Sequence, residues 1–363
     1  MTVIEMAGIG PCPLAGQMLA DHGATVILVT RDQAEPDPAD VTRRGKHLIT
    51  LDLKSPAGHD ALLRLVESAD VLIEGYRPGV MERLGLAPEE CHARNPRLIY
   101  GRMTGWGQTG PRADQPGHDL NYLSLTGALA AMGPADRPPF PPLNLVADYG
   151  GGTMFLLFGV VMALLERTTS GKGQVIDAAM MDGVMSLLSL FHGWQAQGRM
   201  SDARQANLLD GGAPFYRCYE TKDRKFVALA AIEPKFYAAL LRVLDLPETW
   251  LTQQFVRSTW PDRAAVLQRL FRERDRDDWM ALFDGTEACV TPVLDWTEVA
   301  NDPHVRARKS MVERGGVKQA RPAPRLSRTP AAVPTTLSAA GANTAAVLRG
   351  MGFNDREIAA MDL

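Results

Sequence analysis

The chain has 363 residues, of which 45% are hydrophobic, and its 39 Lys and Arg nearly balance its 42 Asp and Glu to leave a net charge of −3. This length predicts two domains, or one large domain with a smaller partner. The charge argues against a nucleic-acid binder or a basic membrane-surface protein. The four cysteines are scattered without CxxC spacing, which argues against a zinc site and a disulfide framework and favours a reducing compartment.

The start of the chain and its apolar runs predict a cytoplasmic protein without a membrane span. The first residues show no basic segment ahead of an apolar run, as a signal peptide would. The longest apolar run, Met154 to Leu165, is too short to cross a bilayer.

The N-terminal residues predict a βαβ unit of Rossmann type. Val3 to Met6 and Ala24 to Val29 predict buried strands, and Leu14 to His22 predicts the helix between them. The dinucleotide fingerprint GxGxxG is only partly met, because Pro13 stands at its third glycine and no acidic residue ends the second strand. Arg31 stands there instead. It suits a ribose phosphate, as in NADP or coenzyme A, although position alone explains it equally well as a solvated charge.

Cations recur just past the carboxyl ends of successive predicted strands. Arg31 is the first, Lys54 follows a strand at 47–53, and Arg77 follows a strand at 69–74. In an open α/β sheet, this edge is where ligands bind. Any one of the three is explained as a surface charge, but their repetition predicts a polyanionic ligand.

A Gly- and Pro-rich region at about 101–152 holds three candidate functional residues, His118, Asn144 and Asp148. We expect His118 to begin a helix, and a helical segment at 144–148 would put Asn144 and Asp148 on one face at i, i+4. A His and an Asp from separate loops are a natural acid/base pair. Each alone is more commonly a surface or turn residue.

The remaining chain predicts a second, smaller domain. Thr153 to Arg167 predicts a buried helix, and Met180 to Gln197 predicts one long helix whose methionine stripe we interpret as core. The predicted fold class is α/β, a Rossmann-like large domain with a smaller α+β domain. The predicted limits are a large domain at 1–197 completed by 325–363, a linker at 198–215, the small domain at 216–310 and a return linker at 311–324.

Several segments together resemble the α-methylacyl-CoA racemases of the family III CoA-transferase superfamily, over essentially the whole chain. The combination of Gly117 to Tyr122 (GHDLNY) with Glu233 is what resembles a racemase, whereas the other pieces are similar across the superfamily. The matching segments are Glu5 to Pro11, Asp52 to Lys54, Val71 to Gly79, Gly101 to Pro111, Gly117 to Tyr122, Asn144 to Gly152, Gly171 to Gln174 and Ala230 to Glu233.

The resemblance implies a role for each matching residue. His118 and Asp148 match two catalytic acid/bases, Glu233 the carboxylate that pairs with the His, and Asn144 the partner of the Asp. The amide of Asp119, at the start of the His118 helix, is our candidate donor to an enolate oxygen. The residues implied in coenzyme A binding are Arg31, Leu51, Asp52, Leu53, Lys54, Gly75, Tyr76, Arg77 and Arg83, with Gly117, Asn121 and Tyr122.

The implied activity is the interconversion of (2R)- and (2S)-2-methylacyl-CoA thioesters by proton transfer through an enolate. One base cannot easily reach both faces of the carbon, so two are expected, with no metal and no cofactor beyond the coenzyme A of the substrate. The resemblance also implies an interlocked homodimer in which Glu233 reaches the active site of the other subunit. Steroid, branched fatty and aryl-propionyl chains all fit as the acyl group.

Three other functions are weighed against this one. A CoA-transferase of the same superfamily would use Asp148 as a nucleophile and form a mixed anhydride, which leaves His118 and Glu233 without a clear purpose. An NADP-dependent enzyme is disfavoured by Pro13. A coenzyme A-binding module without catalysis is disfavoured because both acid/bases are present.

Overall fold

The computed structural model describes residues 1–31, 37, 39–333 and 341–359, and the chain divides into two compact units. The large unit comprises Met1–Thr126, Pro142–Leu188 and Lys309–Leu363, and the small unit comprises Gly127–Pro141 and Ser189–Arg308. The small unit is therefore contributed by two separate insertions into the large one.

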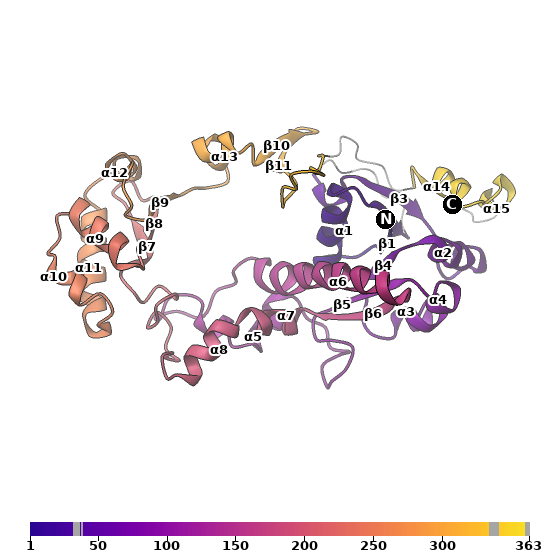
Figure 1. Ribbon diagram of the computed structural model, residues 1–363, viewed down its shortest axis with the longest axis horizontal. Helices are drawn as coiled ribbons and strands as arrows, with labels where there is room; N and C mark the ends of the chain where they lie inside the picture. Colours follow the sequence, from indigo (N-terminus) through magenta and orange to yellow (C-terminus); the bar gives the residue numbers. More distant parts are fainter. Residues whose placement is uncertain (32–36, 38, 334–340, 360–363) are drawn as a thin grey trace. The chain divides into compact units, whose positions relative to one another are not determined.

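A six-stranded parallel sheet forms the centre of the large unit, in the order β3-β2-β1-β4-β5-β6 (Figure 1). Every pair of neighbouring strands is parallel, which is the Rossmann-type order with its reversal between β1 and β4. The predicted α/β fold is confirmed. The strands are β1 (Thr2–Met6), β2 (Thr25–Thr30), β3 (Lys46–Thr50), β4 (Val71–Glu74), β5 (Ile99–Thr104) and β6 (Gln174–Ala179).

Helices cover both faces of this sheet, as the Val-, Ile- and Leu-rich strands require. One face packs on α2 (Pro56–Ser68), α4 (Pro88–Arg94) and α14 (Thr344–Gly350), whose apolar side chains join those of β1 to β3 in one core. The other face contacts α1 (Pro11–Asp21) and α6 (Met154–Ser170). The short helices α3 (Val80–Arg83) and α15 (Asp355–Ala359) complete this part of the unit.

The helix α2 begins at a Ser–Pro pair, which is a helix-start signal in the sequence. The Ser55 hydroxyl oxygen accepts the main-chain N–H of Gly58 at 3.0 Å, and Pro56 occupies the first helical position. The hydroxyl oxygen satisfies one free N–H of the first turn, and the proline ring presets its own φ angle to a helical value.

Two segments near the predicted site differ from the sequence-based expectation. The residues before α6 form η3 (Leu145–Thr153), a π-helix, and the predicted single helix at 180–197 is broken at Leu188 into α7 (Met180–Leu187) and α8 (Ser189–Ala196). The break falls where the chain passes from the large unit to the small one. The prediction of one long helix was wrong because apolar spacing continues across the break and does not report it.

The helix α6 is not fully buried, contrary to prediction. Leu156, Val160 and Ala163 face the core, whereas Phe158 and Leu165 are 64% and 62% exposed. The continuous stretch Leu145–Ser170 is also long and apolar enough to cross a membrane by length and composition, unlike the shorter run considered from sequence alone.

The small unit is an α+β arrangement around its own aromatic core. Its antiparallel sheet has the order β7-β8-β9, and the buried rings of Phe215, Tyr219, Tyr237, Phe271 and Trp279 lie in its core. Its elements are β7 (Tyr216–Glu220), β8 (Phe226–Ala230), α9 (Pro234–Val243), α10 (Thr249–Thr252), α11 (Trp260–Phe271), α12 (Arg276–Phe283), β9 (Val290–Val293) and α13 (Pro303–Ala307).

The segment 127–141 belongs to the small unit, whereas the sequence analysis included it in the large domain. The guanidinium of Arg204 donates to the carbonyl oxygens of Pro134 and Arg137, at 3.1 and 2.7 Å. The segment predicted as a return linker contains the hairpin of β10 (Met311–Arg314) and β11 (Val317–Ala320). The Arg44 guanidinium joins this hairpin to the rest of the large unit, because it donates to Oε1 of Gln319 at 2.6 Å.

Backbone contact between η3 and α7 requires glycine at two positions. A Cβ atom on Gly183 would lie 2.0 Å from the carbonyl oxygen of Gly151, and one on Gly151 would lie 2.5 Å from that of Met180. No Cβ atom fits at either of these two positions.

We expect Gly183→Ala to lower the free energy of unfolding by about 3 kcal/mol, the upper end of the usual cost of overpacking, because the added methyl group meets backbone. Urea denaturation measures this change. Gly350→Ala is the matched control, since outside its own helix turn no atom of the described residues lies within 4 Å of its Cβ position, and its effect should stay within about 0.5 kcal/mol. Equal stabilities for the two variants would contradict the close contact.

Candidate active site

The carboxyl edge of the large sheet gathers the predicted cations. Arg31, Lys54 and Arg77 follow β2, β3 and β4, and all three side chains are exposed. None of them forms an ion pair with an acidic side chain in the part of the chain that the structure describes. The strand order reverses between β1 and β4, which is the place where open α/β sheets leave a crevice for ligands.

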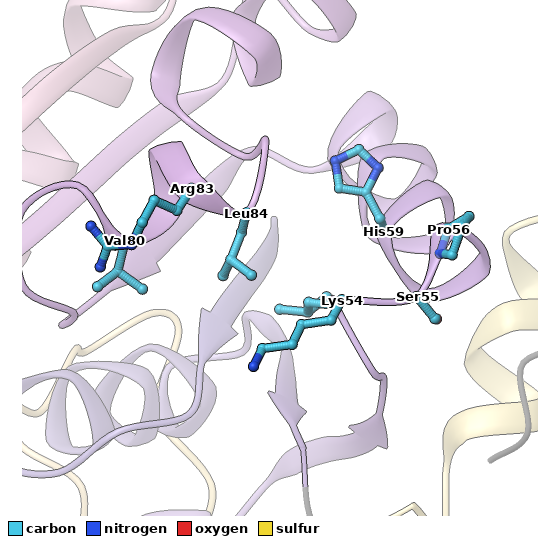
Figure 2. Close-up of a pocket in the computed structure, with 8 residues that line it drawn as sticks. Lys54, Ser55, Pro56, His59, Val80, Arg83 and Leu84 are labelled. Atoms are coloured by element: carbon cyan, nitrogen blue, oxygen red, sulfur yellow. The ribbon is translucent and has the colours of Figure 1, made fainter.

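A pocket of about 640 Å³ opens at this edge, between the start of α2 and α3 (Figure 2). Figure 2 shows Lys54 and Arg83 on either side of Leu84, so that two cations flank an apolar wall. The lining residues are Leu53, Lys54, Ser55, Pro56, His59, Val80, Arg83 and Leu84.

Five of these lining residues were not among the predicted ligand residues: Ser55, Pro56, His59, Val80 and Leu84. His59 joins the two walls, since its Nε2 lies 3.2 Å from the carbonyl oxygen of Gly85. Ser55 and His59 stand one helical turn apart, and Val80 and Leu84 do so on the next helix. This spacing of four residues is the sequence signal that could have identified Ser55, His59, Val80 and Leu84 as members of one pocket.

The other predicted ligand residues near the pocket differ in whether their side chains are buried or exposed. Leu51 is buried in the core, so only its main chain faces the edge. Asp52 is exposed, and its Oδ1 accepts the main-chain N–H of Lys54 at 3.0 Å. Gly75 and Tyr76 belong to the loop after β4.

The buried carboxylate of Glu74 fixes this loop. It accepts the N–H of Tyr76 at 2.7 Å and the Nε–H of Arg102 at 3.2 Å, and Arg102 also pairs with Glu82 of α3 at 2.8 Å. Burial raises the pKa of Glu74 to about 7, against the opposing effects of the Tyr76 N–H and Arg102. One guanidinium thus connects the loop of Tyr76 to the helix that carries Arg83.

His118 stands at the N-terminus of α5 (Asp119–Ser124), as predicted, with an exposed side chain. Its main-chain N–H donates to Oδ1 of Asn121 at 3.1 Å. The Tyr122 ring packs edge-on against Trp106, with ring centres 4.8 Å apart, and its hydroxyl donates to the carbonyl oxygen of Gly117. A Cβ atom on Gly117 would meet this ring at 2.7 Å. These three predicted ligand residues therefore shape the start of the helix.

Asp148 lies half-buried in η3, beside Asn144. The Asn144 Nδ2 donates to Asp148 Oδ2 at 3.2 Å, so the two residues share a face as predicted, although the helix is of the wider π type. The same oxygen lies over the N-terminus of α1, 3.3 Å from the Cβ position of Gly10. Position Gly10 has a φ of 76°, which favours glycine.

The pKa of Asp148 is raised above its ordinary value. Burial raises this pKa, the Asn144 hydrogen bond lowers it, the charge of Asp119 raises it and that of His118 lowers it. The geometric link between the two predicted acid/bases runs through Asp119, which directly follows His118 and whose Oδ2 accepts the main-chain N–H of Asp148 at 2.8 Å.

Asp119 joins the two helices through its side chain, a role that the sequence analysis did not anticipate. Its Oδ2 accepts the main-chain N–H groups of Ala147 and Asp148, each at 2.8 Å. Only the amide of Asp119 was predicted to have a role, as a donor to the enolate oxygen. A signal existed in the Asp directly after the helix-starting His118, since acidic residues in a first turn often accept backbone N–H groups.

Glu233 stands in the small unit, directly before α9 and its first residue Pro234. The side chain of Gln254 holds the preceding residues, because its Nε2 donates to the carbonyl oxygens of Ala231 and Ile232 at 3.2 and 2.7 Å. The pairing of Glu233 with His118, a residue of the large unit, stays a prediction.

We expect Asn144→Leu to raise the pKa of Asp148 further. The substitution removes the donor that stabilises the ionised carboxylate and leaves burial as the main effect. A ¹³C NMR titration of the Asp148 carboxyl carbon measures the change without reference to activity. Asn354→Leu, at an exposed position, is the control and should leave this titration in place. A lower pKa in Asn144→Leu would contradict the assigned hydrogen bond.

Comparison with known proteins identifies the family of this chain. The family model for CoA-transferase family III matches residues 1–344. The chain is 45% identical over 359 residues to a Mus musculus protein named alpha-methylacyl-CoA racemase, covering 98% of this chain and 93% of that protein. It is 42% identical to the Homo sapiens protein of the same name, covering 99% and 94%. A CAIB/BAIF family protein from Brucella suis has a similar structure, with a TM-score of 0.80, 28% identity and coverage of 97% of this chain and 98% of that one. The chain therefore belongs to CoA-transferase family III.

Proposed function

We propose that this protein is a racemase that interconverts (2R)- and (2S)-2-methylacyl-CoA thioesters. The observation that supports the proposal most directly is the connection between the starts of α5 and η3. His118 directly precedes Asp119, whose Oδ2 accepts the main-chain N–H of Asp148 at 2.8 Å. The names of the mouse and human relatives support the same activity.

The chemistry needs one acid/base on each face of the carbon next to the thioester carbonyl. His118 removes the proton from one epimer while protonated Asp148 delivers a proton to the other face, and the reverse reaction exchanges their roles. A carboxyl group whose pKa is raised by burial is suited to this exchange, because it holds its proton at higher pH than an exposed Asp.

The enolate oxygen that forms in between requires hydrogen-bond donors. The amides of Asp119 and Leu120 stand in the first turn of α5, where a helix supplies no internal acceptor for N–H groups. We propose the Asp119 amide as the donor, as the sequence suggested, because it directly follows His118.

The pocket beside Lys54 and Arg83 suits the coenzyme A part of the substrate. Its apolar wall of Leu53, Val80 and Leu84 accommodates a ring, and the two cations are placed for phosphate groups. Arg31 and Arg77 lie at the same sheet edge. No redox or metal group takes part in such proton transfer, and the reducing compartment favoured by the cysteines agrees with a cytoplasmic location.

We also propose that the protein is a homodimer. The helix α6 exposes an apolar stripe of Met154, Phe158, Val161, Met162 and Leu165. A stripe of this kind on a water-facing helix marks an interaction surface. A second copy of the chain is the occupant that we propose, which also accounts for the apolar character of Leu145–Ser170 without a membrane.

The alternative is a CoA-transferase, the activity that names the family. In that mechanism the carboxylate of Asp148 attacks the thioester and His118 has no assigned task. The polar partner Asn144 and the nearby His118 fit proton transfer at Asp148 better, because both act on its protonation.

Either epimer of a 2-methylacyl-CoA should reach the same near-equal mixture in D₂O, with one deuterium gained at C2, as read by mass spectrometry and chiral analysis. His118→Ala and Asp148→Ala should each reduce racemisation by about 100-fold or more, the usual range for a lost acid/base. His47→Ala, at an exposed position on β3, is the control and should retain full activity. Acyl transfer to a free acid without exchange at C2 would establish the transferase instead.

Glu233 is proposed to reach the active site of the partner subunit, and complementation tests this. His118→Ala and Glu233→Gln, co-expressed with different tags and isolated as mixed dimers, should regain activity. Each mixed dimer then holds one site with both His118 and Glu233 intact. If Glu233 acts within its own chain, every site stays defective and the mixed dimers remain as inactive as the separate variants.

A further inference from the structure

The side chain of Asp119 turns away from solvent although its neighbour His118 is exposed. Asp119 is only 6% exposed, and its Oδ2 accepts two main-chain N–H groups, from Ala147 and Asp148, at 2.8 Å each. Both donors belong to the first turn of η3, where a helix leaves its N–H groups without internal partners. The carboxylate of one helix therefore caps the start of another.

We propose that the Asp119 carboxylate is a positioning residue that fixes the start of η3, and with it Asp148, against the start of α5, which carries His118. This inference rests on the proposed function, because it assigns the two acid/bases their relative position. The connection is short: one peptide bond separates Asp119 from His118, and one hydrogen bond joins it to the main chain of Asp148.

The environment of Asp119 explains why a carboxylate serves here. Its second oxygen, Oδ1, is buried without a hydrogen-bond partner among the described residues. Such an oxygen is costly to bury unless positive potential surrounds it. Asp119 lies at the N-termini of both α5 and η3, and the partial positive charge of each helix end favours an anion there.

The same carboxylate acts on the protonation of Asp148. The titratable and charged groups that face Asp148 come from α5, namely His118, Asp119 and Tyr122, while η3 itself supplies Asn144 and α1 approaches with Gly10. Of these groups, Asp119 carries the negative charge that raises the pKa of Asp148. Removing that charge should therefore lower this pKa.

Two substitutions separate position from charge. Asp119→Ala removes both hydrogen bonds, and we expect kcat to fall about 100-fold with little change in KM, as for a small misplacement of a catalytic group. Asp119→Asn keeps an acceptor oxygen of the same shape and removes the charge. It should retain more activity than Asp119→Ala. In the direction in which Asp148 is the base, the acidic limb of its pH–rate profile should move to lower pH.

Asp70→Asn is the matched control. Its carboxylate also accepts a main-chain N–H, that of Thr2 at 2.9 Å, and it precedes β4 at the opposite edge of the same sheet. This variant should lose stability while leaving the acidic limb in place. Wild-type kcat in Asp119→Ala, or an unmoved limb in Asp119→Asn, would overturn the proposal.

A carboxyl ¹³C titration of Asp148 keeps the inference separate from the proposed function. If Asp119→Ala fails to fold, Asp119→Asn decides by this titration and by its pH profile. If the wild-type protein shows no exchange at C2, the proposed function fails. The titration then still supports the carboxylate contact if it shifts to lower pH in Asp119→Asn, and overturns it if it does not.

Discussion

The contact between η3 and its neighbours is the constraint on which the active site depends. The π-helix lies so close to α7 that Gly151 and Gly183 meet through their backbones, and the Thr153 hydroxyl donates to the carbonyl oxygen of Pro11 at 2.9 Å. These contacts set the depth of η3 between α1 and α7. Asp148 therefore lies over the start of α1, half-buried, rather than in solvent. A looser interface would leave the same sequence with an ordinary surface carboxylate.

A second constraint operates beneath α1. Lys46 and Glu5, both fully buried, pair at 2.6 Å, and the Lys46 ammonium also donates to the carbonyl oxygen of Pro13 at 2.9 Å. Burial raises the pKa of Glu5 to about 7 despite this pairing. The Glu5 carboxylate occupies the space beside Gly16, where a Cβ atom would lie 1.7 Å from it. Breaking one partner of such a buried pair is strongly destabilising, so the first turn of α1 is tied to the sheet from below.

The sequence predicted local structure well where a local signal exists. The helix Pro56–Ser68 has a Ser–Pro start, and His118 stands at the start of a helix as predicted. The cations at the sheet edge and the shared face of Asn144 and Asp148 also followed from spacing. Features that depend on distant contacts did not follow. The close packing of η3 on α7 depends on Gly151 and Gly183, and Arg204 binds the carbonyl oxygen of Pro134 in the segment 127–141.

The exposure of α6 shows a different limit of sequence reasoning. Apolar residues surround this helix on all sides, and such a pattern predicts burial. Within a single chain only one side finds a partner, the side of Leu156 and Val160. An apolar helix surface predicts that the surface is covered. It does not indicate whether the same chain or a second chain covers it.

The place of α14 has a consequence for how the protein is made. Asn343 and Thr344 accept main-chain N–H groups of Leu48 and Thr50 in β3, at 3.2 and 3.0 Å, and Leu348 joins the core of the first strands. During synthesis, β3 therefore lacks the partners of these two N–H groups until residues almost 300 positions later have been translated. In that interval its unpaired groups are open to association with other chains. We therefore expect ribosome-bound chains of this protein to carry a sheet whose β3 edge is still uncovered while the small unit is being translated.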